Sequence, residues 1–149
     1  LGVCGVAGGG EEVVQQRAVI RRMVSDLNIP VRIVGHPIVR EADGLAMSSR
    51  NANLDPANRA AALSLSTGLQ LAREKARAGV LATAELTRLV SAHIHGHTGT
   101  EIDYVSFVDS ETLEDVAAVD ERTVLALAVR IDGRVRLIDN GFVLPRPAI

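Results

Sequence analysis

The chain is poor in aromatic residues, cysteine and long apolar runs. Its 149 residues include one tyrosine, two phenylalanines and no tryptophan, which argues against a base-stacking platform for single-stranded nucleic acid. With a single cysteine, no internal disulfide or Cys-type zinc site can form, which fits a reducing cytoplasm. No apolar run approaches the roughly 20 residues of a membrane-spanning helix. The first ten residues also lack the charged region of a signal peptide.

Lysine is almost absent too, since Lys75 is the only lysine among 16 basic residues. A net charge of −2 provides no basic field for nucleic acid or an anionic membrane. A phosphate or carboxylate ligand must therefore be bound by arginine, by backbone N–H groups or by a metal. The composition, 47% hydrophobic and 23% charged, is that of a globular chain with one domain or two small ones.

The first third of the chain predicts a strand, a helix and a second strand. Residues 1–7 fit a short buried strand, residues 8–10 a glycine loop, and residues 11–27 a helix with apolar residues at helical spacing. Residues 28–30 end the helix, and the β-branched residues 31–34 predict a strand. A βαβ unit of this kind indicates a parallel sheet, and ligands usually bind in the loops that follow its strands.

Two helices are predicted next. Asp55 and Pro56 begin the first, which ends at Gly79, and Thr83 caps the second, which ends near Gly96. The residues expected to face the core are Ala62, Leu65, Leu69, Ala72 and Ala76 in the first helix, and Leu86, Leu89, Val90 and Ile94 in the second.

Three strands follow the helices, over residues 103–109, 123–131 and 135–138. Asp132-Gly133 between the last two strands is typical of a type I′ hairpin turn. The last hundred residues thus predict a small α+β domain, and the change of pattern near residues 51–55 places the boundary between two domains, 1–52 and 53–149.

The strongest candidate for chemistry is the stretch Met47-Ser48-Ser49-Arg50-Asn51. Two adjacent hydroxyls and a guanidinium in a loop can hold phosphate oxygens, and backbone N–H groups can add to them. The alternative is a polar loop between domains in which Ser49 and Asn51 cap turns. Spacing alone leaves both open.

Other polar residues are weaker candidates. Gln15-Gln16 could bind a hydroxy acid through an amide or simply form a solvated helix face. His93, His95 and His97 suggest a metal site, but histidines near a helix C-terminus also interact favourably with its dipole. His36 could contact a ligand or merely end a strand.

The glycines around residues 2–10 form no G-x-G-x-x-G or P-loop pattern. A loop before a helix N-terminus could still receive an anion.

Three segments carry a resemblance to a known family. They are residues 29–51, which read IPVRIVGHPIVREADGLAMSSRN, Gln15-Gln16 with residues 19–23 after it, and Leu137-Ile138-Asp139-Asn140. They resemble pantothenate synthetases, the pantoate–β-alanine ligases, from about Gly10 to about Val143. The DGLAMSSRN string is long and specific.

The resemblance implies an ATP- and Mg²⁺-dependent ligase of the cytoplasm. Pantoate is adenylated with release of pyrophosphate, and the amine of β-alanine then attacks the pantoyl adenylate to give pantothenate and AMP. The implied fold is α/β: a Rossmann-like nucleotidyltransferase domain, present in part, followed by a small α+β lid domain with two helices and a three-stranded antiparallel sheet. The family members are usually homodimers, with no nucleic acid or membrane partner.

Site residues follow from the same resemblance. It assigns Met47, Ser48, Ser49 and Arg50 to the ATP phosphates, with the last three as catalytic residues. Other ATP contacts are expected at Gly10 and, through the backbone at the adenine, at Val39. Gln16 is expected to bind pantoate, and no residue is assigned to a metal.

The chain departs from the family pattern before Gln15. The family has Gly-Glu-Lys-Asp where this chain has Gly10-Glu11-Glu12-Val13. The match covers the C-terminal half of the family, so we expect apolar surface in the first fifty residues to be uncovered. A non-catalytic module that keeps the fold and part of the ATP site is the alternative function.

Overall fold

The computed structural model describes residues 11–31, 33 and 38–145, and the side chains among them from residue 17 onward. The predicted strand over residues 1–7, the glycine loop and His36 lie outside the described residues. Helix α1 (Glu11–Asp26) confirms the first predicted helix.

The predicted strand over residues 31–34 is not observed at its two described positions, Val31 and Ile33, which belong to no strand. A strand needs a hydrogen-bonded neighbour, and neither residue is paired within the sheet that the structure describes. The sheet among the described residues is antiparallel throughout, so the parallel sheet predicted from the βαβ pattern is not part of it.

Helix α2 (Pro56–Arg77) begins and ends where its local sequence predicts. The Asp55 side chain accepts a hydrogen bond from the Asn58 N–H (2.8 Å), which satisfies one of the free donors of the first turn. Gly79 follows the helix with a φ of +98°, a conformation that favours glycine. All five residues predicted for the core stripe are buried.

Helix α3 (Thr83–His95) starts differently from the prediction. The N-cap is Ala82, which has no capping side chain, and Thr83 lies inside the first turn. The Thr83 hydroxyl donates instead to the Val116 carbonyl (2.6 Å). It therefore bonds to the segment before β2 and does not cap the helix. Gly96 ends the helix as predicted.

The three predicted strands form one antiparallel sheet of order β1-β2-β3, namely β1 (Thr100–Asp109), β2 (Thr123–Ile131) and β3 (Val135–Phe142). Asp132 and Gly133 both have positive φ, 52° and 63°, and the Arg134 N–H donates to the Ile131 carbonyl. These are the features of the predicted type I′ turn. Strand β3 extends four residues beyond its predicted end and brings Asp139 to the edge of the sheet.

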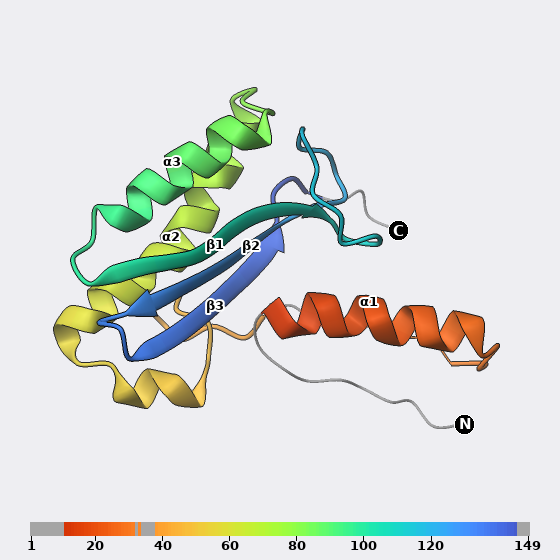
Figure 1. Ribbon diagram of the computed structural model, residues 1–149, viewed down its shortest axis with the longest axis horizontal. Coiled ribbons are helices and arrows are strands. Elements are labelled where there is room, and N and C mark those ends of the chain that lie inside the picture. The colour runs from red at the N-terminus through yellow and green to blue at the C-terminus, as the bar shows by residue number, and fades with distance from the viewer. Residues whose placement is uncertain (1–10, 32, 34–37, 146–149) are drawn as a thin grey trace.

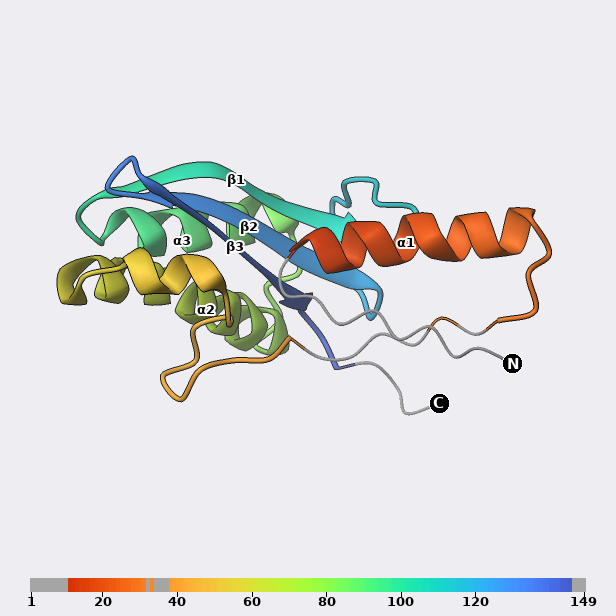
Figure 2. The same ribbon diagram turned by 90° about the horizontal axis from the view of Figure 1, so that it is seen from below.

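Helices α2 and α3 pack side by side over one face of the sheet (Figures 1 and 2). The core between the two layers is aliphatic, apart from Phe107. Its largest fully buried side chains include Leu65, Leu69, Leu86, Ile94, Leu125, Leu127 and Ile131. Burying each such side chain contributes about 1.5–3 kcal/mol, so this double layer holds most of the stability.

Helix α1 lies apart from α2 and α3 and approaches the sheet at β3 (Figure 1). Its apolar face is uncovered, with Val19 59% and Met23 48% exposed. This is the uncovered apolar surface expected in the first fifty residues. Within the described part of the chain, no helix is long and apolar enough to cross a membrane.

Candidate phosphate-binding site

Residues 39–47 form a small hairpin that leads into the predicted phosphate loop. Arg40 and Ala46 face each other in an isolated antiparallel bridge. The Met47 N–H donates to the Val39 carbonyl (2.9 Å), which closes the open end of the hairpin. These contacts fix the direction in which the chain enters Ser48.

The tip of this hairpin has a specific backbone conformation and a buried side chain. Gly44 has a φ of +95°, which a residue with a side chain rarely adopts. Leu45, the next residue, is buried in the core of the α+β domain and anchors the returning side of the hairpin. The hairpin is thus attached to the helices and sheet through apolar packing as well as hydrogen bonds.

After the hairpin the chain turns into a short 3-10 helix, η1 (Ser49–Asn53). Ser48 is the N-cap of η1, and its Oγ accepts a hydrogen bond from the Arg50 N–H (3.3 Å). Ser49 and Arg50 are exposed. Among the described residues, none forms an ion pair or hydrogen bond with the Arg50 guanidinium. The loop therefore presents a positive charge and two hydroxyls, the groups that bind phosphate oxygens.

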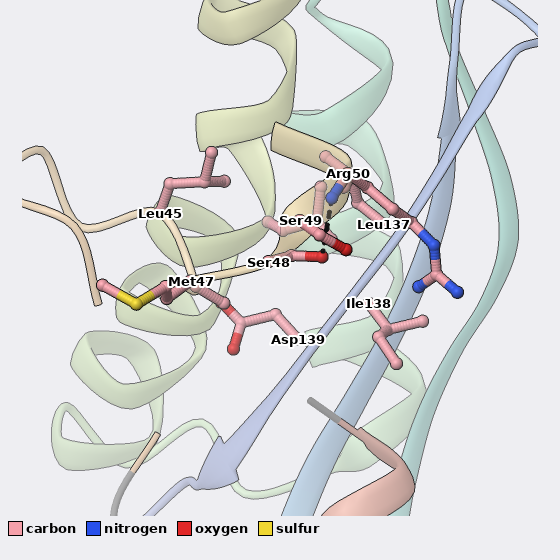
Figure 3. A pocket seen from close by; sticks show the side chains of 10 residues that line it. Leu45, Met47, Ser48, Ser49, Arg50, Leu137, Ile138 and Asp139 are labelled. Carbon is pink, nitrogen blue, oxygen red and sulfur yellow. Dashed lines mark hydrogen bonds between the residues drawn. The ribbon is translucent and has the colours of Figure 1, made fainter. Parts of the chain in front are cut away.

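These side chains line a pocket of about 290 Å³ between the loop, α2 and β3 (Figure 3). The loop forms one wall, and the edge strand β3 forms the opposite wall. In Figure 3 the Arg50 side chain extends across β3 near Ile138, and the Ser48 hydroxyl lies between the loop and that strand. The lining residues are Leu45, Ala46, Met47, Ser48, Ser49, Arg50, Leu65, Leu137, Ile138 and Asp139.

Asp139 is the only carboxylate in this lining, and it is already paired. The Arg40 guanidinium donates to both of its oxygens, from Nη1 to Oδ2 at 2.7 Å and from Nη2 to Oδ1 at 2.8 Å. The Asn140 N–H also donates to Oδ1 (2.8 Å). The side chain of Asp139 is only 2% exposed. Because both oxygens already accept hydrogen bonds, this carboxylate is poorly suited to bind a metal ion.

A second set of polar contacts holds the other end of the loop. Asn51 is buried, and its Nδ2 donates to Glu41 Oε1 (2.6 Å) and to the Ala46 carbonyl (3.0 Å). Arg59 of α2 forms ion pairs with both Glu41 and Asp43. The chain on both sides of residues 47–50 is therefore tied to the hairpin and to α2.

The same contacts shift the ionisation of the two acidic residues. The hydrogen bond from Asn51, followed by the one from Arg59, lowers the pKa of Glu41. The Leu45 N–H, followed by Arg59, lowers the pKa of Asp43. Both carboxylates therefore remain charged, and both contacts remain intact, at neutral pH.

The structure brings most of the predicted ATP residues together. Met47, Ser48, Ser49 and Arg50 line one pocket, and Val39 lies opposite Met47 with its carbonyl already occupied. Gly10 and the side chain of Gln16 lie outside the described residues, although position 16 is in α1. The roles of these residues in binding ATP and pantoate remain predictions.

The polar-loop alternative named the wrong capping residues. Ser48 rather than Ser49 caps η1, and the Asn51 side chain bonds to Glu41 and the Ala46 carbonyl instead of capping a turn. The buried Asn51 side chain is structural, because it joins Glu41 to the loop.

Sequence reasoning missed Arg40 and Asp139 as partners. They are 99 residues apart, and no local pattern links them. The only available signal was that each lies in a segment resembling the same family.

The three histidines do not form a metal site in this structure. Within the described residues, no group of three or more His, Cys, Asp or Glu side chains could hold a metal ion. The rings of His93 and His97 meet edge to face with centroids 5.6 Å apart, and His93 Nε2 lies 2.7 Å from Thr67 Oγ1. Burial, and secondarily the nearby His97, lowers the pKa of His93.

Comparison with known proteins identifies the family. The model of the pantoate-beta-alanine ligase family matches residues 4–142. The chain belongs to this family. The match includes the hairpin, the loop over residues 47–50 and β3, and so covers both walls of the pocket.

Curated relatives agree with this assignment. The pantothenate synthetase of Citrifermentans bemidjiense is 50% identical over 134 residues, covering 90% of this chain and 48% of the relative. That of Geobacter sulfurreducens is 53% identical over 131 residues, covering 88% and 46%. The chain therefore spans about half the length of the curated relatives it matches.

Solved structures of the family share the fold. Pantothenate synthetase from Thermus thermophilus matches with a TM-score of 0.80 at 40% identity, over 88% of this chain and 47% of that one. The pantoate-beta-alanine ligase of Francisella tularensis, complexed with beta-gamma ATP and β-alanine, matches with a TM-score of 0.51 at 27% identity. That match covers 87% of this chain and 40% of the other.

Proposed function

We propose that this chain supplies the ATP-phosphate site of a pantoate–β-alanine ligase. The observation that carries the proposal is the exposed Arg50 guanidinium, which has no partner among the described residues and lies beside two serine hydroxyls in the pocket wall. The exposed guanidinium is free to form new contacts, and a polyphosphate would engage it through paired hydrogen bonds.

In the proposed reaction, a carboxylate oxygen of pantoate attacks the α-phosphorus of ATP and pyrophosphate leaves. The β-alanine amine then attacks the acyl carbon, and AMP leaves as pantothenate forms. Arg50, with Ser48 and Ser49, would hold the departing pyrophosphate, on which negative charge increases as the bond breaks. Exclusion of water matters because an acyl adenylate hydrolyses readily.

Mg²⁺ is part of the proposed reaction as the partner of ATP. The pocket lining does not fit it as a protein-held ion, since both oxygens of Asp139 accept hydrogen bonds from Arg40. We therefore assign no metal ligand among the lining residues.

The finer features expected of the family belong to the same proposal. They are a Rossmann-like domain that includes residues 1–52, a homodimer, and a cytoplasmic location. The exposed apolar face of α1 supports a larger first domain, because side chains such as Val19 gain about 25 cal/mol per Å² when covered. The single cysteine fits a reducing compartment.

The test is ATP binding and AMP formation by the chain at its full given length. Calorimetry with ATP and Mg²⁺ would compare the wild type with Arg50→Ala and with Arg88→Ala. Arg88 is an exposed arginine on α3 that pairs with Glu85 and is absent from the pocket lining, so this variant removes the same charge elsewhere. We expect Arg50→Ala to lose binding and Arg88→Ala to keep it.

AMP formation with pantoate and β-alanine present separates the two functions. Turnover that disappears in Arg50→Ala supports ligase activity in these 149 residues. Binding without turnover supports the alternative of a module that keeps part of the ATP site. Absence of ATP binding, or equal binding by the wild type and Arg50→Ala, contradicts the proposal.

A further inference from the structure

We infer that Asp139, acting through Arg40, is a positioning residue for the phosphate loop over residues 47–50. The inference rests on the proposed function, because it concerns the same pocket. It assigns to Asp139 a role other than metal binding or proton transfer, although this carboxylate lies in the pocket lining.

The Asp139 carboxylate is held by three hydrogen bonds. Both oxygens accept from the Arg40 guanidinium, and Oδ1 also accepts from the Asn140 N–H. With an exposure of 2%, the side chain has little contact with solvent. A buried carboxylate with these three hydrogen bonds is held in one orientation, so it acts as a fixed anchor on β3.

Arg40 also forms contacts within the hairpin. The same Nη1 that reaches Asp139 also donates to the Gly44 carbonyl at the hairpin tip (3.0 Å). The backbone of Arg40 bridges to Ala46, immediately before the loop. One guanidinium therefore ties β3 to both the start and the tip of the hairpin.

The pocket lies between the loop and β3, and Ile138 and Asp139 form the wall opposite the loop. Of the described ion pairs, Arg40–Asp139 is the one that joins β3 to the hairpin leading into the loop. Loss of this ion pair would allow the loop to change its position relative to β3. It would remove none of the side chains that are proposed to contact phosphate.

Two substitutions test the inference, each with a matched control. Asp139→Asn keeps the shape and removes the charge, and Asp103→Asn makes the same change at a carboxylate paired with Arg130 and Arg136 on the sheet. Arg40→Lys keeps the positive charge but removes the paired N–H donors of the guanidinium. Arg130→Lys makes the same change on the sheet and is the matched control. Arg40→Lys retains one possible contact with Asp139, so it serves if Asp139→Asn fails to fold.

Hydrogen exchange provides a readout that needs no ligand. The Met47 N–H donates to Val39 and the Asn51 N–H to the Ser48 carbonyl, so both amides report on the loop. We expect exchange at these amides to rise about tenfold or more in Asp139→Asn, and less in Arg40→Lys, relative to amides of β2. Unchanged loop exchange, or an equal rise throughout β2, would overturn the inference.

ATP affinity provides the readout that a purely structural role would not move. If Asp139 acts through the loop, the loss of affinity caused by Arg50→Ala shrinks at least several-fold in an Asp139→Asn background. Additive effects of the two substitutions would overturn the inference. If the wild type binds no ATP, the proposed function fails, and hydrogen exchange alone then decides whether Asp139 positions the loop.

Discussion

The guanidinium of Arg73 lies directly against Gly141 at the edge of the sheet. A Cβ at position 141 would lie 2.7 Å from Arg73 Nη2 and 3.0 Å from Leu69 Cδ2. Arg73 Nε meanwhile donates to the Phe142 carbonyl (2.9 Å). Glycine at this position therefore lets an α2 side chain cross β3 and bond to its last residue.

Gly141→Ala is expected to destabilise the domain by about 1–3 kcal/mol, because the added methyl group must displace Arg73 and press on the buried Leu69. Urea unfolding of the wild type, Gly141→Ala, Arg73→Ala and the double variant would measure this. Since Arg73→Ala removes the nearer obstacle, the double variant should be more stable than the sum of the single effects predicts. Strict additivity would contradict this explanation.

Acid should weaken the attachment of the hairpin to α2. Hydrogen bonding from Asn51 and Arg59 lowers the pKa of Glu41 from its ordinary 4.5. A carboxyl with a lower pKa in the folded state contributes stability that is fully present above 4.5 and is lost as pH falls through the folded value. The difference in unfolding free energy between wild type and Glu41→Gln should therefore shrink from about pH 6 to about pH 3. A constant difference would argue against the ion-pair explanation.

Helix α3 should gain stability from the cap that it lacks. Ala82 has an extended backbone suited to an N-cap but no side-chain acceptor, and Glu85 lies three residues later. Ala82→Ser would create the Ser-x-x-Glu pattern of a capping box and should stabilise the protein by about 1 kcal/mol. Thermal unfolding would show the gain, and Ala84→Ser, inside the first turn, is the matched control that should show none.

His93 should titrate below its ordinary pKa of 6.5. Burial is the larger cause and His97 the smaller, so His97→Gln should raise the pKa of His93 only in part. Because the folded pKa is the lower one, His93 contributes stability above 6.5 that is lost as pH falls. NMR titration of the ring protons in both proteins measures the shift, and a pKa of 6.5 or higher in the wild type would contradict it.

Helix α1 should exchange its amides faster than the sheet. Its exposed apolar residues, including Val19 and Met23, contribute little to any core, whereas β2 is buried along nearly its whole length. We expect exchange to be at least about tenfold faster over residues 19–26 than over residues 124–129. Hydrogen exchange with mass spectrometry measures both segments at once, and uniform protection would show that α1 is covered.

Local signals in the sequence were enough for most of the elements. The side chain of Asp55 and the conformational freedom of Gly79 act within one turn of α2, so its ends could be predicted without tertiary information. The Asp132-Gly133 turn and the apolar run of β2 are equally local. The contiguous hydroxyls and guanidinium of residues 47–50 also marked this loop as a candidate site, and the structure places them in one pocket, while their role in binding phosphate stays a prediction.

The wrong predictions of helix and strand ends depend on contacts between segments that are distant in the sequence. Thr83 has a good capping side chain, but the Val116 carbonyl competes for it. Strand β3 continues through Asp139, Asn140 and Gly141, which are poor strand residues, because β2 supplies hydrogen-bonding partners along its whole length. Val31 and Ile33 show the reverse case. Their β-branched side chains favour a strand, but they form none because they have no hydrogen-bonded partner in the described sheet.

The separation of Arg40 from Asp139 by 99 residues also has a consequence for the order of synthesis. Ribosomes extend a chain from its N-terminus at about 5–20 residues per second, so the phosphate loop emerges several seconds before the strand that anchors it. During that interval the loop has its hairpin but no opposite wall. A nascent chain should therefore acquire the pocket only when β3 pairs with β2, so the pocket forms late in synthesis.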